Sequence, residues 1–164
     1  NQIRKLNTGK SRKRMSTYKT RKASIEDAHT IAPLFDAYRQ FYEQEADLEF
    51  AKQFIHSRLS NNESIIFIAE DETKNALGFC QIYPSFCSVI GSPIYVLYDL
   101  FVSAGIRKSG IGGLLLEQAR LHAKENKIPR MDLTTAKTNL TAQSLYESLG
   151  WVRDEIFYAY NKSV

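Results

Sequence analysis

The chain of 164 residues has only two cysteines, Cys80 and Cys87, and no long run of apolar residues. Two thiols without a histidine cluster beside them argue against a disulfide framework or a metal site, and we expect both to be small apolar side chains in a reducing compartment. No stretch of about 18 apolar residues is present, which excludes a membrane-spanning helix. The basic N-terminal stretch lacks the apolar segment of a secretory signal. Together these absences predict a cytoplasmic protein that holds no metal and binds no membrane.

Acidic residues are missing from the first 22 positions, which hold nine of the 22 lysines and arginines. The rest of the chain then carries 13 cations against 18 acids, a net charge of −5 that suits a cationic partner. We expect residues 1–15 to be a disordered leader or an added arm, and residues 16–164 to form a single domain. Nucleic-acid binding through this arm is an alternative, but no aromatic residue precedes Tyr18 and no nucleic-acid-binding fold is recognisable, so nucleic acid is not the expected partner.

The spacing of apolar residues predicts an α/β fold with a mixed sheet. The first helix is expected to follow an N-cap pair at Ser24 and Asp27 and to run to about residue 43, although Pro33 within it predicts a kink or a later start. Further helices are expected at 48–59, from Gly110 to before Pro129, and at 141–149, where Gly150 is a good left-handed cap. Strands are expected at 17–23, 64–70, 76–86, 94–102, 130–136 and 152–161, the last one broken near Asp154.

The stretch GIRKSGIGGLLLEQA at 105–119 places two glycines between a pair of cations and an apolar run. It is not a Walker loop, because Ile111-Gly112 stands where Lys and Ser/Thr are needed, and it lacks the third glycine of the dinucleotide fingerprint, which Leu115 replaces. A helix that begins near Gly110 nevertheless offers unpaired amides at the positive end of its dipole, and glycines allow a phosphate to approach them. The loop is therefore either an anion site or a helix that merely starts with glycine.

Two motifs decide between these alternatives by resemblance. Arg107-x-x-Gly110-x-Gly112, directly after the strand ending in DLFV, resembles the acetyl-CoA pyrophosphate loop of the GNAT superfamily of N-acyltransferases. The segment TTAKTNLTAQSLYESLGW at 134–151 resembles the family's motif Asn-x-x-Ala-x-x-Leu-Tyr-x-x-x-Gly-aromatic through Asn139, Ala142, Leu145, Tyr146, Gly150 and Trp151. The resemblance implies a mostly antiparallel central sheet with splayed strands flanked by helices, with acetyl-CoA as co-substrate and no metal.

The resemblance also implies roles for individual residues on the acetyl-CoA side. The backbone of Leu100, Phe101 and Val102 would pair with the pantetheine arm, and an amide on that strand would polarise the thioester carbonyl. Asn139 would contact the pantetheine. The pyrophosphate would be held by Arg107 and by the amides of Lys108, Ser109, Gly110, Ile111, Gly112 and Gly113.

Tyr146 would protonate the departing thiolate, because a phenol with a pKa near ~10 can donate to a thiolate whose conjugate acid lies near ~8.5. The alternative is that Tyr146 is a packed helix aromatic. Some polyamine-acetylating relatives have a Glu-Asp pair where this chain has Tyr98-Asp99, so a direct glutamate base is missing here. Asp99 is expected to hold the amine or a chain of waters, or else to be a carboxylate satisfied by amides of the sheet.

The acceptor is expected to lie against the segment DAYRQFYEQEADLEF at 36–50, whose acids and aromatic residues suit an ammonium group, with residues 83–88 as the opposite wall. Packing alone is the alternative for both segments. The leading hypothesis is transfer of an acetyl group from acetyl-CoA to a primary amine of a small or cationic acceptor, by direct attack in a ternary complex, as in small stand-alone members that acetylate polyamines, histone tails or small amines. A CoA-binding sensor without chemistry remains an alternative. The family's habit predicts a homodimer formed through the sheet edge or the C-terminal strand.

Overall fold

The computed structural model describes residues 17–164, so the arm expected at 1–15 lies outside the described residues. At its centre is a five-stranded sheet with the strands in sequence order. All neighbouring strands are antiparallel except the last two, which are parallel. The strands are β1 (Lys19–Lys22), β2 (Ile65–Glu70), β3 (Ala76–Cys87), β4 (Ser92–Val102) and β5 (Met131–Asp132). The expected mixed fold with a mostly antiparallel sheet is confirmed.

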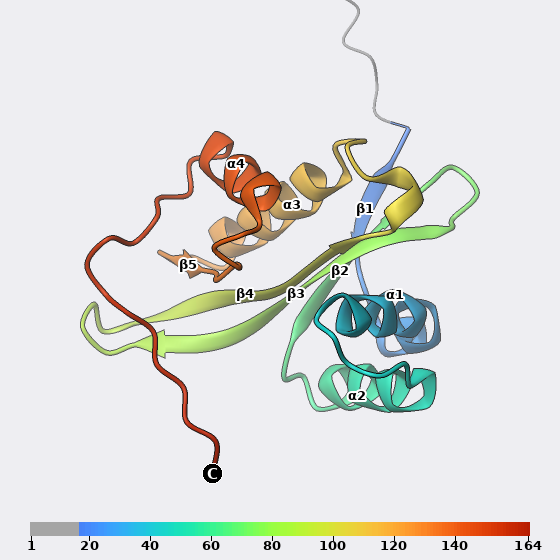
Figure 1. The fold of residues 1–164 in the computed structure, drawn as a ribbon, viewed down its shortest axis with the longest axis horizontal. Coiled ribbons are helices and arrows are strands. Elements are labelled where there is room, and N and C mark those ends of the chain that lie inside the picture. Colours follow the sequence, from blue (N-terminus) through green and yellow to red (C-terminus); the bar gives the residue numbers. More distant parts are fainter. Residues whose placement is uncertain (1–16) are drawn as a thin grey trace, which may run out of the picture.

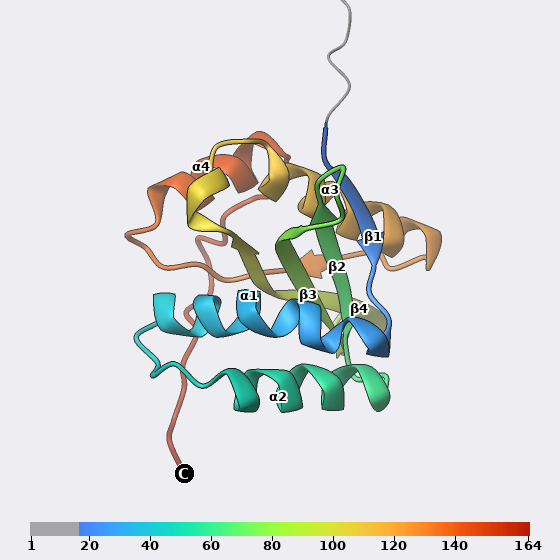
Figure 2. The same ribbon diagram turned by 90° about the vertical axis from the view of Figure 1, so that its right-hand side faces the viewer.

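Helices cover both faces of this sheet (Figures 1 and 2). On one face lie α1 (Ala28–Phe41) and α2 (Leu48–Ser60), and on the other lie α3 (Ile111–Glu125) and α4 (Leu140–Ser148). Each of the four expected helices is present, but α1 runs through Pro33 from Ala28, so the later start was wrong. None of the helices within residues 17–164 is long and apolar enough to cross a membrane.

The sheet separates two apolar cores. Ile66, Ile68 and Phe79 face α1 and α2, whereas Phe67 and Cys80 face α3. This burial on both faces explains the continuous apolar sequence of β2, because a strand covered on both sides has no polar face to alternate with. Burial also raises the pKa of the Cys80 thiol to about 12, which makes it an inert packing group.

The C-terminal strand expected at 152–161 is absent, and the strand expected at 130–136 shrinks to Met131–Asp132. The Asp154 carboxylate accepts hydrogen bonds from the amides of Ile156 and Phe157 at 2.8 and 3.1 Å, which turns the chain there. Among the described residues no strand runs beside 152–164 to pair with it, and Figure 1 shows this segment passing beyond the sheet. Its apolar alternation therefore has no hydrogen-bonding neighbour to make it a strand.

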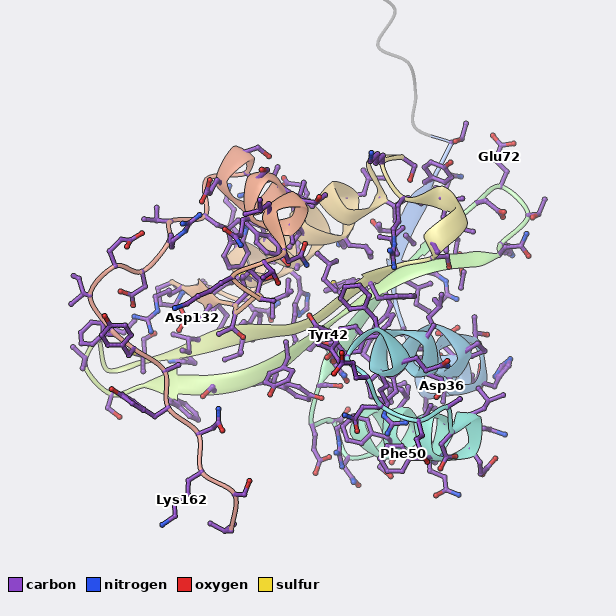
Figure 3. The ribbon with its side chains drawn as sticks, in the orientation of Figure 1. Asp36, Tyr42, Phe50, Glu72, Asp132 and Lys162 are labelled. Atoms are coloured by element: carbon purple, nitrogen blue, oxygen red, sulfur yellow. The ribbon has the colours of Figure 1, made fainter. Side chains whose placement is uncertain are left out.

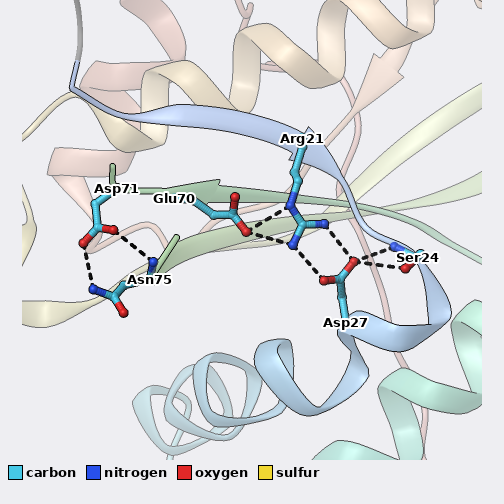
Figure 4. Close-up of polar contacts among 6 residues, drawn as sticks. All are labelled: Arg21, Ser24, Asp27, Glu70, Asp71 and Asn75. Carbon is cyan, nitrogen blue, oxygen red and sulfur yellow. Dashed lines mark hydrogen bonds and ion pairs between the residues drawn. The ribbon is translucent and has the colours of Figure 1, made fainter. Parts of the chain in front are cut away.

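An ion-pair cluster joins β1 to β2 and to the turn before α1 (Figure 4). The Arg21 guanidinium on β1 donates two hydrogen bonds to Asp27, at 2.7 and 2.8 Å, and one to Glu70 on β2 at 2.9 Å. Asp27 in turn accepts from the amide of Ser24 at 2.7 Å, which sets the turn before α1. Arg21 lowers the pKa of Asp27 from its ordinary 3.8 to about 2.

We expect Arg21→Met to lower the free energy of unfolding at neutral pH. Because the folded-state pKa of Asp27 is depressed, its contribution is present above about pH 4 and is lost as the pH falls toward 2, so the difference from wild type shrinks over that interval. Arg120→Met is the matched control, since Arg120 pairs with Glu117 on one exposed helix face. Urea unfolding at several pH values measures both. An Arg21→Met deficit that did not change with pH would contradict the assignment.

Candidate active site

One extra residue on β4 determines which side chains reach the site. Gln81 on β3 pairs with Asp99, and the next residue, Ile82, pairs with Leu97. Tyr98 therefore has no pairing partner on β3 and forms a β-bulge. Leu97 faces α3, and without the bulge the alternation of a strand would send Asp99 to that same apolar face. With the bulge, Asp99 faces α1 instead.

Asp99 is a buried carboxylate at the end of a chain of hydrogen bonds. Its side chain accepts from Gln81 Nε2 at 2.6 Å, and Gln81 Oε1 accepts from the Ser64 hydroxyl at 2.7 Å. The residue is 3% exposed, and it has no ion-pair partner among the described residues. Burial raises the pKa of Asp99 above its ordinary value, and the hydrogen bonds from Gln81 and Tyr38 offset that only in part.

Above Asp99 is a cavity of about 700 Å³ between the sheet and the two N-terminal helices. Aromatic rings from four elements line most of it, among them Tyr38, Tyr42, Phe50 and Tyr83. Figure 3 shows Tyr42 at the end of α1 beside the sheet and Phe50 below it on α2. Rings of the expected acceptor segment 36–50 thus line this cavity, whereas the acids of that segment do not.

The acid of this segment nearest the core has a structural task instead. Asp36 is 8% exposed, and it accepts from the Asp47 amide at 2.9 Å and from Gln40 at 3.1 Å. It thereby joins α1 to the turn before α2. Of the segment 83–88, only Tyr83 lines the cavity. Sequence reasoning missed Gln81, although a glutamine inside the apolar strand ALGFCQIY is a signal for a buried polar contact.

The sheet opens beside the cavity. β4 pairs with β5 only at Tyr95 with Met131 and at Val96 with Asp132, and among the described residues no strand follows this edge of β4 farther on. The expected positions Leu100, Phe101 and Val102 all lie on the open part. An open strand edge presents backbone groups to which an extended ligand can bind.

The loop that follows β4 exposes amides at the start of α3. Gly110 has φ +87°, and Lys108 also has a positive φ of 65°. The first backbone hydrogen bond of the helix runs from the Leu114 amide to the Gly110 carbonyl at 3.1 Å, and no amide from Ser109 to Gly113 donates one among the described residues. Such a run of free amides at a helix start is an anion-binding geometry.

The two cations of the loop differ in their surroundings. The Arg107 guanidinium lies over the rings of Phe41 and Phe101, at 5.7 and 5.8 Å, and its Nε donates to the Val102 carbonyl at 3.4 Å. It therefore bridges α1 and the end of β4. Lys108 and Ser109 are exposed at the turn.

Three residues of the α4 motif have structural roles. The Asn139 side chain caps α4 by accepting from the Ala142 amide at 3.2 Å. A side chain at Gly112 would come within 3.2 Å of Leu145, so this glycine allows α4 to pack against α3. Gly150 has φ +87° and ends α4 as expected.

Tyr146 on α4 is half-buried against the second core, with its ring 6.2 Å from that of Trp151. Burial raises the pKa of its hydroxyl, and the Tyr42 hydroxyl nearby raises it further. Tyr42 in turn packs edge-on to Tyr38 at 5.1 Å. Two tyrosines, Tyr38 and Tyr42, thus lie between Asp99 and Tyr146.

The acetyltransferase (GNAT) family model matches residues 31–151. The chain is 46% identical over 140 residues, 85% of its length and 93% of the relative's, to an uncharacterised N-acetyltransferase, YhfO, of Bacillus subtilis. It superposes on the crystal structure of a probable acetyltransferase with a TM-score of 0.83 and 35% identity, over 89% of this chain and 97% of the other. It belongs to the GNAT family of acetyltransferases.

As a GNAT acetyltransferase, the protein is an enzyme of a family that uses acetyl-CoA. The same fold occurs in a predicted acetyltransferase of Clostridium acetobutylicum that was solved with acetyl-CoA, at a TM-score of 0.70 and 16% identity over 88% of this chain and 96% of that one. The open edge of β4 and the free amides of 109–113 suit an extended pantetheine arm and a diphosphate. Within residues 17–164, no group of three or more His, Cys, Asp or Glu side chains could hold a metal ion.

We expect Gly110→Ala to weaken CoA binding in this acetyltransferase about tenfold. A side chain at φ +87° costs about 1–2 kcal/mol, which the loop relieves by leaving the conformation that aims its amides. Gly105→Ala is the matched control, because Gly105 has open space around it and is not among the glycines of positive φ. Calorimetric titration with CoA measures both variants. Equal affinity of Gly110→Ala and wild type would refute an amide-built phosphate site.

Proposed function

We propose that the enzyme transfers the acetyl group of acetyl-CoA to a primary amine by direct attack in a ternary complex. The observation that carries this proposal is Asp99, a buried carboxylate without a counter-ion among the described residues, at a cavity beside the open edge of β4. A buried charge is costly unless something pairs with it. An incoming ammonium group supplies the missing partner.

On the donor side, acetyl-CoA is proposed to lie along the open edge of β4, with its pyrophosphate on the amides of 108–113. Arg107 would leave the Val102 carbonyl, at 3.4 Å, to reach the phosphates. A backbone amide beside the Tyr98 bulge would donate to the thioester oxygen as negative charge develops there. This arrangement puts the thioester between the α1 cavity and α4.

On the acceptor side, the ammonium group is proposed to give one proton to Asp99, directly or through a water. The raised pKa of Asp99 suits it to this task, since a carboxylate with a higher pKa is a stronger base. The neutral nitrogen then attacks the carbonyl carbon, the carbon–sulfur bond breaks, and the nitrogen releases its second proton. Tyr98, 66% exposed in the cavity wall, would contact the acceptor through its ring.

Tyr146 is proposed to protonate the sulfur of the leaving CoA. Its raised pKa keeps the hydroxyl protonated at neutral pH, so a proton is available when the thiolate forms. The second proton from the nitrogen then returns to Tyr146 through solvent. The products are an acetylamide, free CoA thiol and the proton held by Asp99.

We expect Tyr146→Phe to bind CoA with unchanged affinity and to turn over about 10- to 1000-fold more slowly, the scale of a lost proton transfer. Release of CoA thiol and calorimetry measure the two quantities. Tyr95→Phe is a control at a buried tyrosine that lies on the α3 face against His122. Wild-type turnover of Tyr146→Phe would remove the residue from catalysis. If the wild type binds CoA but releases no CoA thiol from acetyl-CoA with any amine tested, the alternative of a CoA-binding sensor without chemistry is favoured.

We expect kcat/KM of the wild type to fall as the pH drops through the raised pKa of Asp99, because the protonated acid cannot accept a proton. Asp99→Asn should be far slower and should lose that acidic limb. Since the folded-state pKa is raised, the ionised carboxylate lowers stability at neutral pH, so Asp99→Asn should unfold at the same temperature or higher. The control variant Asp36→Asn, at a residue that does not line the cavity, should keep the fall of kcat/KM at acidic pH. An unchanged limb in Asp99→Asn would exclude Asp99 as the base.

A further inference from the structure

The cavity that faces Asp99 carries a second charge, of opposite sign. Arg39 on α1 lines it, and among the described residues Arg39 and Asp99 are its only charged lining side chains. The remainder is aromatic or neutral, including Gln44, Thr134 and Thr135. The acids at 43, 45, 47 and 49 are absent from the lining, so a polycation would find one carboxylate here and a guanidinium that repels it.

Arg39 is held in place with much of its hydrogen-bonding capacity unused. Its guanidinium lies 4.6 Å over the ring of Phe50. Only Nη1 has partners among the described residues, both distant: the Glu45 carbonyl at 3.5 Å and the Asp36 carboxylate at 3.8 Å. Nε and Nη2 therefore remain available, and a guanidinium binds a carboxylate best through two such N–H groups.

Asp36 lies within ion-pair distance of Arg39, at 3.8 Å, but accepts no hydrogen bond from its guanidinium. Its two oxygens already accept hydrogen bonds from the Asp47 amide, at 2.9 Å, and from Gln40, at 3.1 Å. The side chain of Arg39 is 19% exposed, so its charge lies in a partly dry environment where an incoming anion interacts more strongly than at an open surface.

We infer that the acceptor is an aminocarboxylate: its ammonium group goes to Asp99, its carboxylate to Arg39, and its apolar body to the rings between them. This inference rests on the proposed function and names the substrate class of that site. A cavity of about 700 Å³ lined by aromatic rings takes a body of amino-acid size with an apolar or aromatic side chain. The two charges then set the orientation of the acceptor.

Matched pairs of amines test the carboxylate requirement. The full chain with acetyl-CoA is assayed for thiol release with phenylalanine against 2-phenylethylamine, with 6-aminohexanoate against hexylamine, and with spermidine as a polycation. We expect the carboxylated member of at least one pair to have a kcat/KM about 10- to 100-fold above that of its plain amine, the scale of a charge-assisted hydrogen bond. Plain amines or spermidine used as well as both aminocarboxylates would overturn the inference while leaving acetyl transfer intact.

Arg39→Met removes the charge and keeps the apolar stem on Phe50. It should lower kcat/KM for the carboxylated amine about 10- to 100-fold relative to the plain amine, and Arg39→Lys should restore part of the preference. Arg58→Met is the matched control, because Arg58 also lies over an aromatic ring, Phe54 at 4.7 Å, but does not line the cavity. An equal loss for both members of a pair in Arg39→Met, without rescue by lysine, would overturn the assignment.

Binding separates this inference from the proposed reaction. Calorimetry of phenylalanine or 6-aminohexanoate into CoA-saturated enzyme should show uptake that Arg39→Met weakens by the same factor. If such uptake occurs without thiol release, the reaction fails and the acceptor class stands. If amines are acetylated but neither aminocarboxylate binds better than its plain partner, the reaction stands and the acceptor class fails.

Discussion

The extra residue at Tyr98 is the constraint on which the site depends. A strand alternates strictly, so the face of each side chain after a bulge is reversed relative to the regular strand. Before the bulge Leu97 packs toward α3, and after it Asp99 faces α1 while Leu100 and Val102 return to the α3 core. In a regular strand of the same sequence, Asp99 would share the apolar α3 face with Leu97, and Leu100 and Val102 would face α1. The bulge at Tyr98 thus determines that Asp99 faces the cavity and not the apolar core under α3.

β4 also lies between the proposed binding sites for the acetyl donor and for the acceptor. β3 pairs with β4 from Ser92 to Val102 except at the Tyr98 bulge, while β5 pairs with only two residues of β4 and leaves the other edge open. The chain then passes directly from Val102 through a short loop into α3, so the free amides of the helix start lie beyond the end of the open edge. In the proposed reaction, backbone groups bind the donor, and side chains of α1 and β4 bind the acceptor.

Much of this arrangement could be predicted from local sequence. The helix starts, the left-handed glycines and the Asn139 cap are set by residues close together in the chain, and the spacing of two motifs sufficed to predict the loop and α4. The bulge could not be predicted, because it depends on the register between two strands. Nor could the role of Arg39, whose place in the cavity follows from the packing of α1 on the sheet. The predicted strand at 152–161 was wrong for a related reason. Alternating apolar side chains favour a strand, but a strand forms only where a neighbouring strand supplies backbone hydrogen bonds.

The proposed acceptor gives a reason for the two charges of the cavity, one of which, Asp99, does not favour folding in its ionised form. Asp99 is buried without a cation beside it. Its raised pKa means that keeping this carboxylate ionised in the folded protein lowers the free energy of unfolding. Gln81 and Ser64 reduce that cost without removing it, because amide and hydroxyl dipoles orient the carboxylate but do not neutralise it. Arg39 stands on an aromatic ring with only distant acceptors. Asp99 has no ion-pair partner among the described residues, and Arg39 has only Asp36, at 3.8 Å. In the proposed complex a bound zwitterion would place a closer opposite charge beside each of them, which would offset part of the cost of burying them.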